Sequence, residues 1–140
     1  MGVDKQKGFS LVEMLVVVVI IGIIAGIGIP LFKKAIFAAE NMSTYTVLKI
    51  MLQEQLNFYT HNSRYARLDE LNAGYGNNFG TMVGNELKRG KFSFSLVGGS
   101  LPPTDAELKD NFNLVATRVL DPDIYVVTIA PDGAIVQILP

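Results

Sequence analysis

The sequence lacks several residues on which protein chemistry often depends. Among its 140 residues there is no cysteine, no tryptophan and a single histidine. A disulfide framework, a thiolate metal site and a cysteine nucleophile are therefore excluded. The histidine, His61, has no serine–acid pair at a recognisable spacing, and we interpret it as a solvated residue at a helix end. The composition argues against an enzyme.

Charge is sparse in total and unevenly placed. The formal net charge is -1, so the chain lacks the basic footprint expected of a nucleic-acid-binding protein. Residues 14–29 include no charged or strongly polar side chain. The remainder, roughly a hundred residues, has the composition of one soluble domain.

The apolar run covers residues 9–32. As a helix it would be about 36 Å long at ~1.5 Å per residue, enough to cross a hydrocarbon core of ~30 Å. A polar leader, residues 1–8, precedes it, and no small-residue cleavage site of the secretory type follows it. These features alone leave a simple membrane anchor open as one interpretation.

Glu13 is an acidic residue inside this run. A central acidic group costs roughly 2.5–3.5 kcal/mol on insertion scales and less near the end of a span, so Glu13 needs a partner or a function. Cleavage of the chain after Gly8 would create a partner, the positively charged α-amino group of Phe9. Two buried charges are costly apart and tolerable together.

The segment GFSLVEML, which begins at Gly8, and the apolar sequence after it resemble the N-terminus of type IV pilins and pseudopilins. The resemblance runs from Lys7 to Phe32. In that family a prepilin peptidase cuts after the glycine and methylates the new amino terminus. The resemblance therefore implies cleavage between Gly8 and Phe9 and N-methylation of Phe9. It also implies that Glu13 pairs with the amino terminus of a neighbouring subunit during assembly.

The resemblance further implies an α+β, pilin-like fold, in which a long N-terminal helix packs on an antiparallel meander sheet. We expect a cleaved leader at residues 1–8, a hydrophobic transmembrane and assembly half of the helix at 9–32, an amphipathic half at 33–62 and a globular head at 63–140. The implied partners are other copies of the chain, the prepilin peptidase, the membrane before assembly and the pilus assembly machinery. The implied location is the inner membrane for the precursor and then an extracellular filament. No cofactor is expected.

Four residues weaken the helix near its middle: Gly22, Gly26, Gly28 and Pro30. Each glycine costs about 1 kcal/mol relative to alanine in a helix interior, and a proline costs about 3. Two interpretations remain open, a kink at Pro30 or a locally extended stretch that neighbouring helices cover in a filament.

Apolar residues of the amphipathic half form two adjacent stripes at 100° per residue. The first stripe contains Tyr45, Leu48, Leu52, Leu56 and Tyr59, and the second contains Val47, Met51 and Phe58. Either one stripe packs on the sheet and the other faces neighbouring subunits, or the helix is deeply buried in its own domain.

The head changes in character at residue 91. Residues 63–90 are rich in turn-forming residues and predict a loop with one helical turn at 68–71. Residues 91–140 alternate with a period of two around Phe92 and Phe112, and two further runs at 124–129 and 134–139 flank a turn. We predict three or four antiparallel strands.

Other candidate sites are weak. Asp121, Asp123 and Asp132 lack the spacing of a calcium loop and are interpreted as turn residues. Asn41 begins a glycosylation sequon but lies on a predicted helix. The sequence therefore predicts a structural subunit of a type IV pilus serving adhesion, motility or DNA uptake. The alternatives are a pseudopilin of a type II secretion system and a minor or tip pilin that acts as a binding module.

Overall fold

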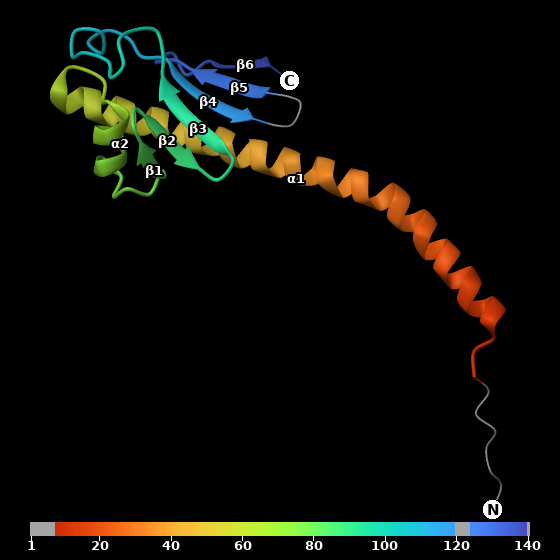
Figure 1. Ribbon diagram of the computed structural model, residues 1–140. Helices are drawn as coiled ribbons and strands as arrows, with labels where there is room; N and C mark the ends of the chain where they lie inside the picture. Colours follow the sequence, from red (N-terminus) through yellow and green to blue (C-terminus); the bar gives the residue numbers. More distant parts are fainter. Residues whose placement is uncertain (1–7, 120–123, 140) are drawn as a thin grey trace, which may run out of the picture. The chain divides into compact units, whose positions relative to one another are not determined.

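A computed structural model describes residues 8–119 and 124–139 (Figure 1). Seven residues of the expected leader, 1–7, lie outside the described residues, as do Asp121 and Asp123. The chain divides into two compact units that meet between Asn41 and Met42, and each is described by itself.

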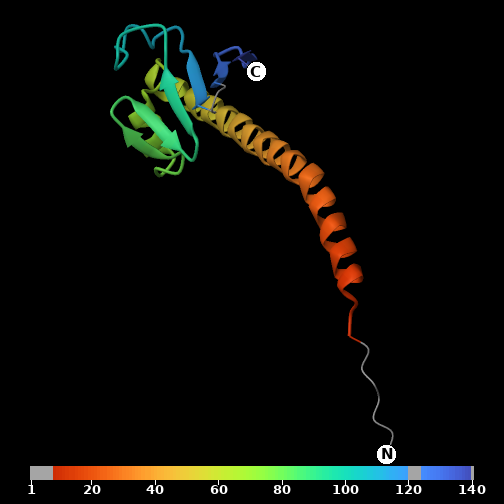
Figure 2. The ribbon, with the colours of Figure 1, turned by 45° about the vertical axis from the view of Figure 1, so that its right-hand side comes forward.

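The first unit consists mainly of the N-terminal part of helix α1, which spans Leu11–Asn62. All residues from 8 to 39 are exposed. The helix runs without interruption through Pro30, and Figure 2 shows this orange-to-red part as a continuous ribbon. Pro30 has no N–H to donate to the carbonyl of Gly26, so one backbone hydrogen bond is missing there. Weakening of the helix at this point stays a prediction.

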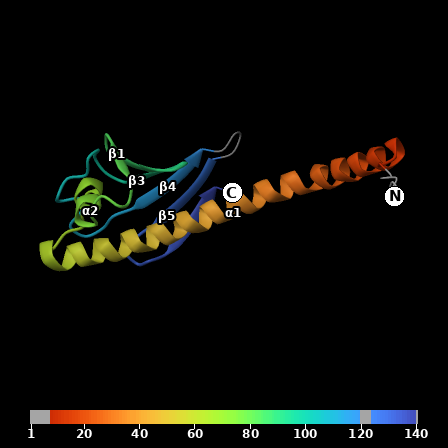
Figure 3. The same cartoon turned by 90° about the horizontal axis from the view of Figure 1, so that it is seen from below.

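The second unit packs the remainder of α1 against a six-stranded antiparallel sheet in the order β1 to β6. Figure 3 shows the strands and the yellow part of α1 from below. The strands are β1 Thr81–Val83, β2 Glu86–Arg89, β3 Phe92–Leu96, β4 Leu114–Val119, β5 Ile124–Ile129 and β6 Ile135–Leu139. The predicted α+β meander is confirmed.

The predicted number of strands was too low, because β1 and β2 occupy part of the segment expected to be loop. Their sequence signal is weak: both strands are short, and Leu87 is the one fully buried residue between them. The two-residue turn Gly84-Asn85, with Gly84 at φ 62°, was the available signal for this hairpin. Helix α2, Leu68–Gly74, contains the predicted helical turn.

The helix packs through one face, so it is not deeply buried on all sides. Its buried residues are Thr44, Val47, Leu48, Met51 and Gln55. That face contains Val47 and Met51 of the second apolar stripe and Leu48 of the first, and Leu52 and Phe58 pack against the core while partly buried. Leu56 and Tyr59, also of the first stripe, are 37% and 38% exposed. The core residues that the sheet contributes include Phe94 of β3, Leu114 of β4 and Ile129 of β5.

Gln55 is a buried polar residue that the apolar pattern did not predict. Its side-chain amide donates to the carbonyl of Ala66 at 2.9 Å, and its Oε1 accepts the Ala66 N–H at 2.7 Å. Because both polar atoms are satisfied, burial of Gln55 is tolerated. The pair of bonds ties the end of α1 to the segment that leads into α2.

Candidate processing and assembly site

The residues that precede α1 form an exposed, non-helical segment. Gly8, Phe9 and Ser10 lie outside the helix, and Phe9 is 79% exposed. A Cβ added to Gly8 would meet no heavy atom within 4 Å. Packing within the chain therefore does not explain a glycine at this position. An external partner that needs a small residue here would explain it.

Ser10 and Glu13 together begin the helix. The Ser10 N–H donates to Glu13 Oε2 at 2.8 Å, and Ser10 Oγ accepts the Val12 N–H at 3.3 Å. The Ser10 carbonyl accepts the Met14 N–H at 3.2 Å, the first backbone bond of the helix. This reciprocal arrangement is a capping box, which satisfies N–H groups that a helix start leaves unpaired. The Ser-x-x-Glu spacing was a sequence signal for it that our sequence analysis did not use.

The first part of α1 presents an apolar surface that is uncovered in a single chain. An 18-residue window has a mean hydropathy of 3.0 and no buried residue, and the helix is long and apolar enough to cross a membrane. Fully burying one large aliphatic or aromatic side chain is worth about 1.5–3 kcal/mol. Exposure of Phe9, Leu15, Ile20, Ile24 and Phe32 to water is therefore strongly unfavourable. Such a surface needs lipid or neighbouring protein.

The helical glycines have no packing role within the chain. A Cβ added to Gly22, Gly26 or Gly28 would contact nothing within 4 Å. Each nevertheless lowers helix stability by about 1 kcal/mol relative to alanine. Small residues on a lipid-embedded helix allow neighbouring helices to approach closely. These positions therefore fit contacts made outside the single chain.

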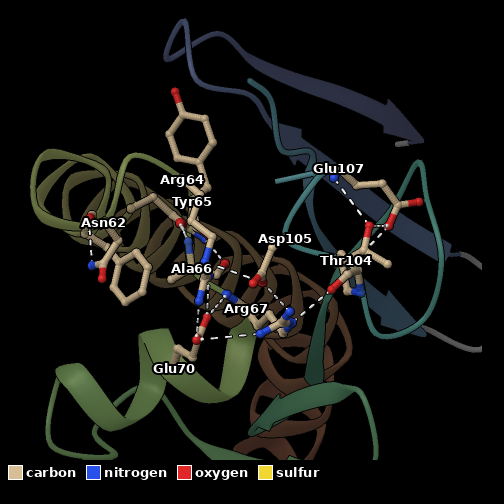
Figure 4. Close-up of polar contacts among 12 residues, drawn as sticks. Asn62, Arg64, Tyr65, Ala66, Arg67, Glu70, Thr104, Asp105 and Glu107 are labelled. Carbon is tan, nitrogen blue, oxygen red and sulfur yellow. Dashed lines mark hydrogen bonds and ion pairs between the residues drawn. The ribbon is translucent and has the colours of Figure 1, made fainter. Parts of the chain in front are cut away.

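The head contains two polar clusters that the sequence analysis missed (Figure 4). In the first, Arg64 makes a bidentate pair with Glu70 at 2.7 and 2.8 Å, and Arg67 bonds Asp105. The hydrogen bond from Arg64 is the main cause that lowers the pKa of Glu70 to about 2. This cluster joins the start of α2 to the long β3–β4 connection.

The second cluster joins residues within the β3–β4 connection to one another. Glu107 accepts hydrogen bonds from the N–H and hydroxyl groups of Ser100 and Thr104, at 2.6–2.9 Å. These bonds, with that of the Ser100 hydroxyl the largest cause, lower the pKa of Glu107 to about 2. Both clusters hold loops in place, and neither lies in the predicted N-terminal site.

The remaining candidates occupy ordinary structural positions. His61 is exposed in the last turn of α1, as predicted, with Nδ1 2.9 Å from the Asn57 carbonyl oxygen. Asp132 accepts the Ala134 N–H at 2.9 Å and is a turn residue, also as predicted. Asn41 lies on α1 and is half-buried.

Comparison with known proteins bears on this N-terminal arrangement. Residues 3–29 match the family described as the prokaryotic N-terminal methylation motif. The chain is 28% identical to the type IV major pilin protein PilA of Myxococcus xanthus (strain DK1622), over 93% of this chain and 61% of that protein. It is 33% identical to the type IV major fimbrial protein FimA of Dichelobacter nodosus, over 75% of this chain and 61% of that protein.

The chain thus spans about three fifths of the length of these two relatives. A shorter match, 47% identical over 36 residues, is to the fimbrial protein EcpB of Eikenella corrodens; it covers 26% of this chain and 23% of that protein. No solved structure matches the chain.

An uncovered apolar helix followed by a helix-backed antiparallel sheet defines a protein of the pilin-like α+β class. Residues 3–29 match the prokaryotic N-terminal methylation motif, and the chain is similar to type IV major pilins over about three fifths of their length.

Proposed function

We propose that this chain is a structural subunit of a type IV pilus, which polymerises through the first part of α1 into an extracellular filament. The observation that carries the proposal is the exposed apolar helix that begins with the methylation motif and contains Glu13. An apolar surface of this extent is stable in the cytoplasmic membrane before assembly. Neighbouring helices replace the lipid in the filament.

A prepilin peptidase cuts the precursor between Gly8 and Phe9 and methylates the amino group of Phe9. The exposure of both residues and the open space around Gly8 support this step. Glu13 then pairs with the Phe9 amino group of a neighbouring subunit. That pairing offsets the cost of placing both charges in an apolar environment and favours one axial register between helices.

The names of the relatives favour a pilus over the two alternatives. The three relatives described above are named as a type IV major pilin, a type IV major fimbrial protein and a fimbrial protein, and neither alternative occurs in those names. Electron microscopy of surface-sheared material, with mass spectrometry of its dominant protein, distinguishes these functions. Long filaments composed mainly of this chain support a major pilin, and its absence from them supports an alternative.

The processing step is tested by mass spectrometry of the protein from filaments or membranes. We expect a mature chain that begins with N-methylphenylalanine at Phe9. A Gly8→Leu variant should remain as the uncut precursor, because a bulky residue enters a position that requires a small one. Gly74→Leu, at an exposed position of the head, is the matched control and should be processed normally. An intact Met1 in the parent's filaments would contradict the proposal.

A further inference from the structure

We propose that the Ser10–Glu13 capping box ends α1 before the bond between Gly8 and Phe9 and so presents that bond to the peptidase as extended chain. Ser10 is then a positioning residue for processing. This inference rests on the proposed function, because it concerns the same cleavage.

The geometry of the helix start carries the inference. Three contacts meet at Ser10: its N–H donates to Glu13, its hydroxyl accepts from Val12, and its carbonyl accepts the first helical bond, from Met14. A residue that makes these contacts takes the N-cap position, which has a non-helical backbone. The two residues before it, Gly8 and Phe9, are consequently outside the helix and exposed.

Without the capping box, extension of the helix toward the leader becomes more favourable. Unpaired backbone N–H groups are costly at a membrane, and another helical turn through Phe9 and Gly8 would pair those that the box now satisfies. That turn would enclose the scissile bond. Its carbonyl would accept a helical hydrogen bond, whereas a peptide is usually bound as an extended chain whose backbone groups are free to pair with the partner.

The size of the effect follows from the preference for N-cap residues. Serine, asparagine and aspartate are the best caps, threonine and glycine are close, and alanine is much poorer. Loss of the cap lowers the ratio of the extended to the helical form about fivefold. Cleavage that depends on the extended form slows by up to the same factor when binding of the precursor limits the rate.

The experiment measures the cleavage time course of full-length precursor in membranes that contain prepilin peptidase. We expect Ser10→Ala to be cut more slowly than the parent, by up to about fivefold, and Ser10→Asn and Ser10→Thr to be cut at rates near the parent's. Ser10→Gly separates capping from direct recognition of the side chain. Glycine offers no side chain to a peptidase pocket, yet it caps better than alanine, so Ser10→Gly should be cut faster than Ser10→Ala.

Ser43→Ala, an exposed serine-to-alanine change within α1, is the matched control and should be cut at the parent's rate. Hydrogen exchange at the Glu13 amide gives a second measurement that is independent of the peptidase. It should be slower in Ser10→Ala than in the parent, because in the extended helix the Glu13 N–H donates to the Phe9 carbonyl.

The outcomes separate the two hypotheses. If the parent is not cut between Gly8 and Phe9, the proposed function is wrong. If the parent is cut there and Ser10→Ala is cut equally fast, or Ser10→Gly is cut no faster than Ser10→Ala, the positioning role of Ser10 is overturned and the proposed function stands.

Discussion

At the scale of single residues, Glu13 carries two functions that can be separated. Its carboxylate accepts the Ser10 N–H within the chain, and it is the group proposed to receive a neighbour's amino terminus. The capping hydrogen bond gives the Glu13 carboxylate a backbone donor in the unassembled chain. This bond lowers the free-energy cost of placing the charged carboxylate at the edge of the lipid. In the proposed assembly, an ion pair with the neighbour's amino terminus replaces or supplements this bond.

We expect Glu13→Ala to reduce strongly the incorporation of processed subunits into filaments. The Phe9 amino group of the neighbour would be buried without a partner, at a cost of about 3–5 kcal/mol. Because the loss recurs at every addition, even ~1.4 kcal/mol gives a tenfold change in the equilibrium constant. The measurement is the ratio of surface-sheared to membrane-retained protein, counted among processed molecules.

Ser10→Ala is the control for this experiment, since it weakens the capping box and keeps the carboxylate. Its processed molecules should assemble at the parent's ratio. An unchanged ratio in Glu13→Ala would show that Glu13 is a tolerated residue of a simple membrane anchor.

At the scale of elements, the junction of α1, α2 and the β3–β4 connection is held by charge as well as by apolar packing. Arg64 lies between Glu70 and Asp105, and its guanidinium carbon also lies 5.2 Å from the centre of the Phe58 ring. The Gln55–Ala66 pair of bonds lies in the same region. These polar contacts add to the apolar packing of Tyr65, Leu68 and Leu71 in the same region.

The Arg64–Glu70 pair should make the head sensitive to acid. The folded pKa of Glu70, about 2, lies below its ordinary value of 4.5, so the pair's contribution is fully present above pH 4.5 and is lost as the pH falls toward 2. We expect Glu70→Gln to lower the free energy of unfolding at pH 7 by about 1–2 kcal/mol, after allowance for partial exposure. The difference from the parent should shrink toward pH 2.

Urea unfolding of the head at several pH values between 7 and 2 measures this effect. Asp69→Asn, one residue away on the exposed side of α2, is the matched control and should lower the free energy of unfolding less than Glu70→Gln, because Asp69 attracts Arg64 through its charge, whereas Glu70 also accepts hydrogen bonds from it. A Glu70→Gln variant as stable as the parent at pH 7 would show that solvent screening leaves the pair without net effect.

At the scale of the whole molecule, the chain combines two units with opposite solvent requirements. The first part of α1 has no buried residue through Ala39, whereas the second unit has its own core built around Leu48, Phe94 and Leu114. Because the second unit buries its apolar residues internally, we expect it to fold without the first. The exposed helix, in contrast, needs lipid or neighbouring protein to cover its apolar side chains.

A fragment that begins at Ala35 should therefore be soluble, folded and monomeric. It keeps the helical face that packs on the sheet and removes the membrane span. Circular dichroism and light scattering measure its folding and its mass. Filaments formed by this fragment would show that assembly does not require the N-terminal helix.

Much of the fold could be predicted because its signals are local. The alternation of Phe92, Phe94 and Leu96 predicted β3, and similar patterns predicted β4 to β6. Two strands were missed because a three-residue strand such as β1 buries too little to establish a period. The Ser-x-x-Glu spacing from Ser10 to Glu13 is a local signal of a helix start, and the structure places that start at Leu11.

The sequence by itself determined the resemblance to type IV pilins and predicted the residues of the N-terminal site. The methylation motif lies in consecutive residues, and the length and hydropathy of an apolar run predict a membrane span without reference to the rest of the chain. The tertiary structure decided which helical stripe is buried, that Gln55 lies in the core, and that Arg64 meets Glu70 and Asp105. It also explains Gly80, where a Cβ would come within 2.4 Å of the Lys88 carbonyl oxygen on β2. These features depend on contacts between segments distant in the chain, and sequence periodicity reports only which residues share a face, not what that face meets.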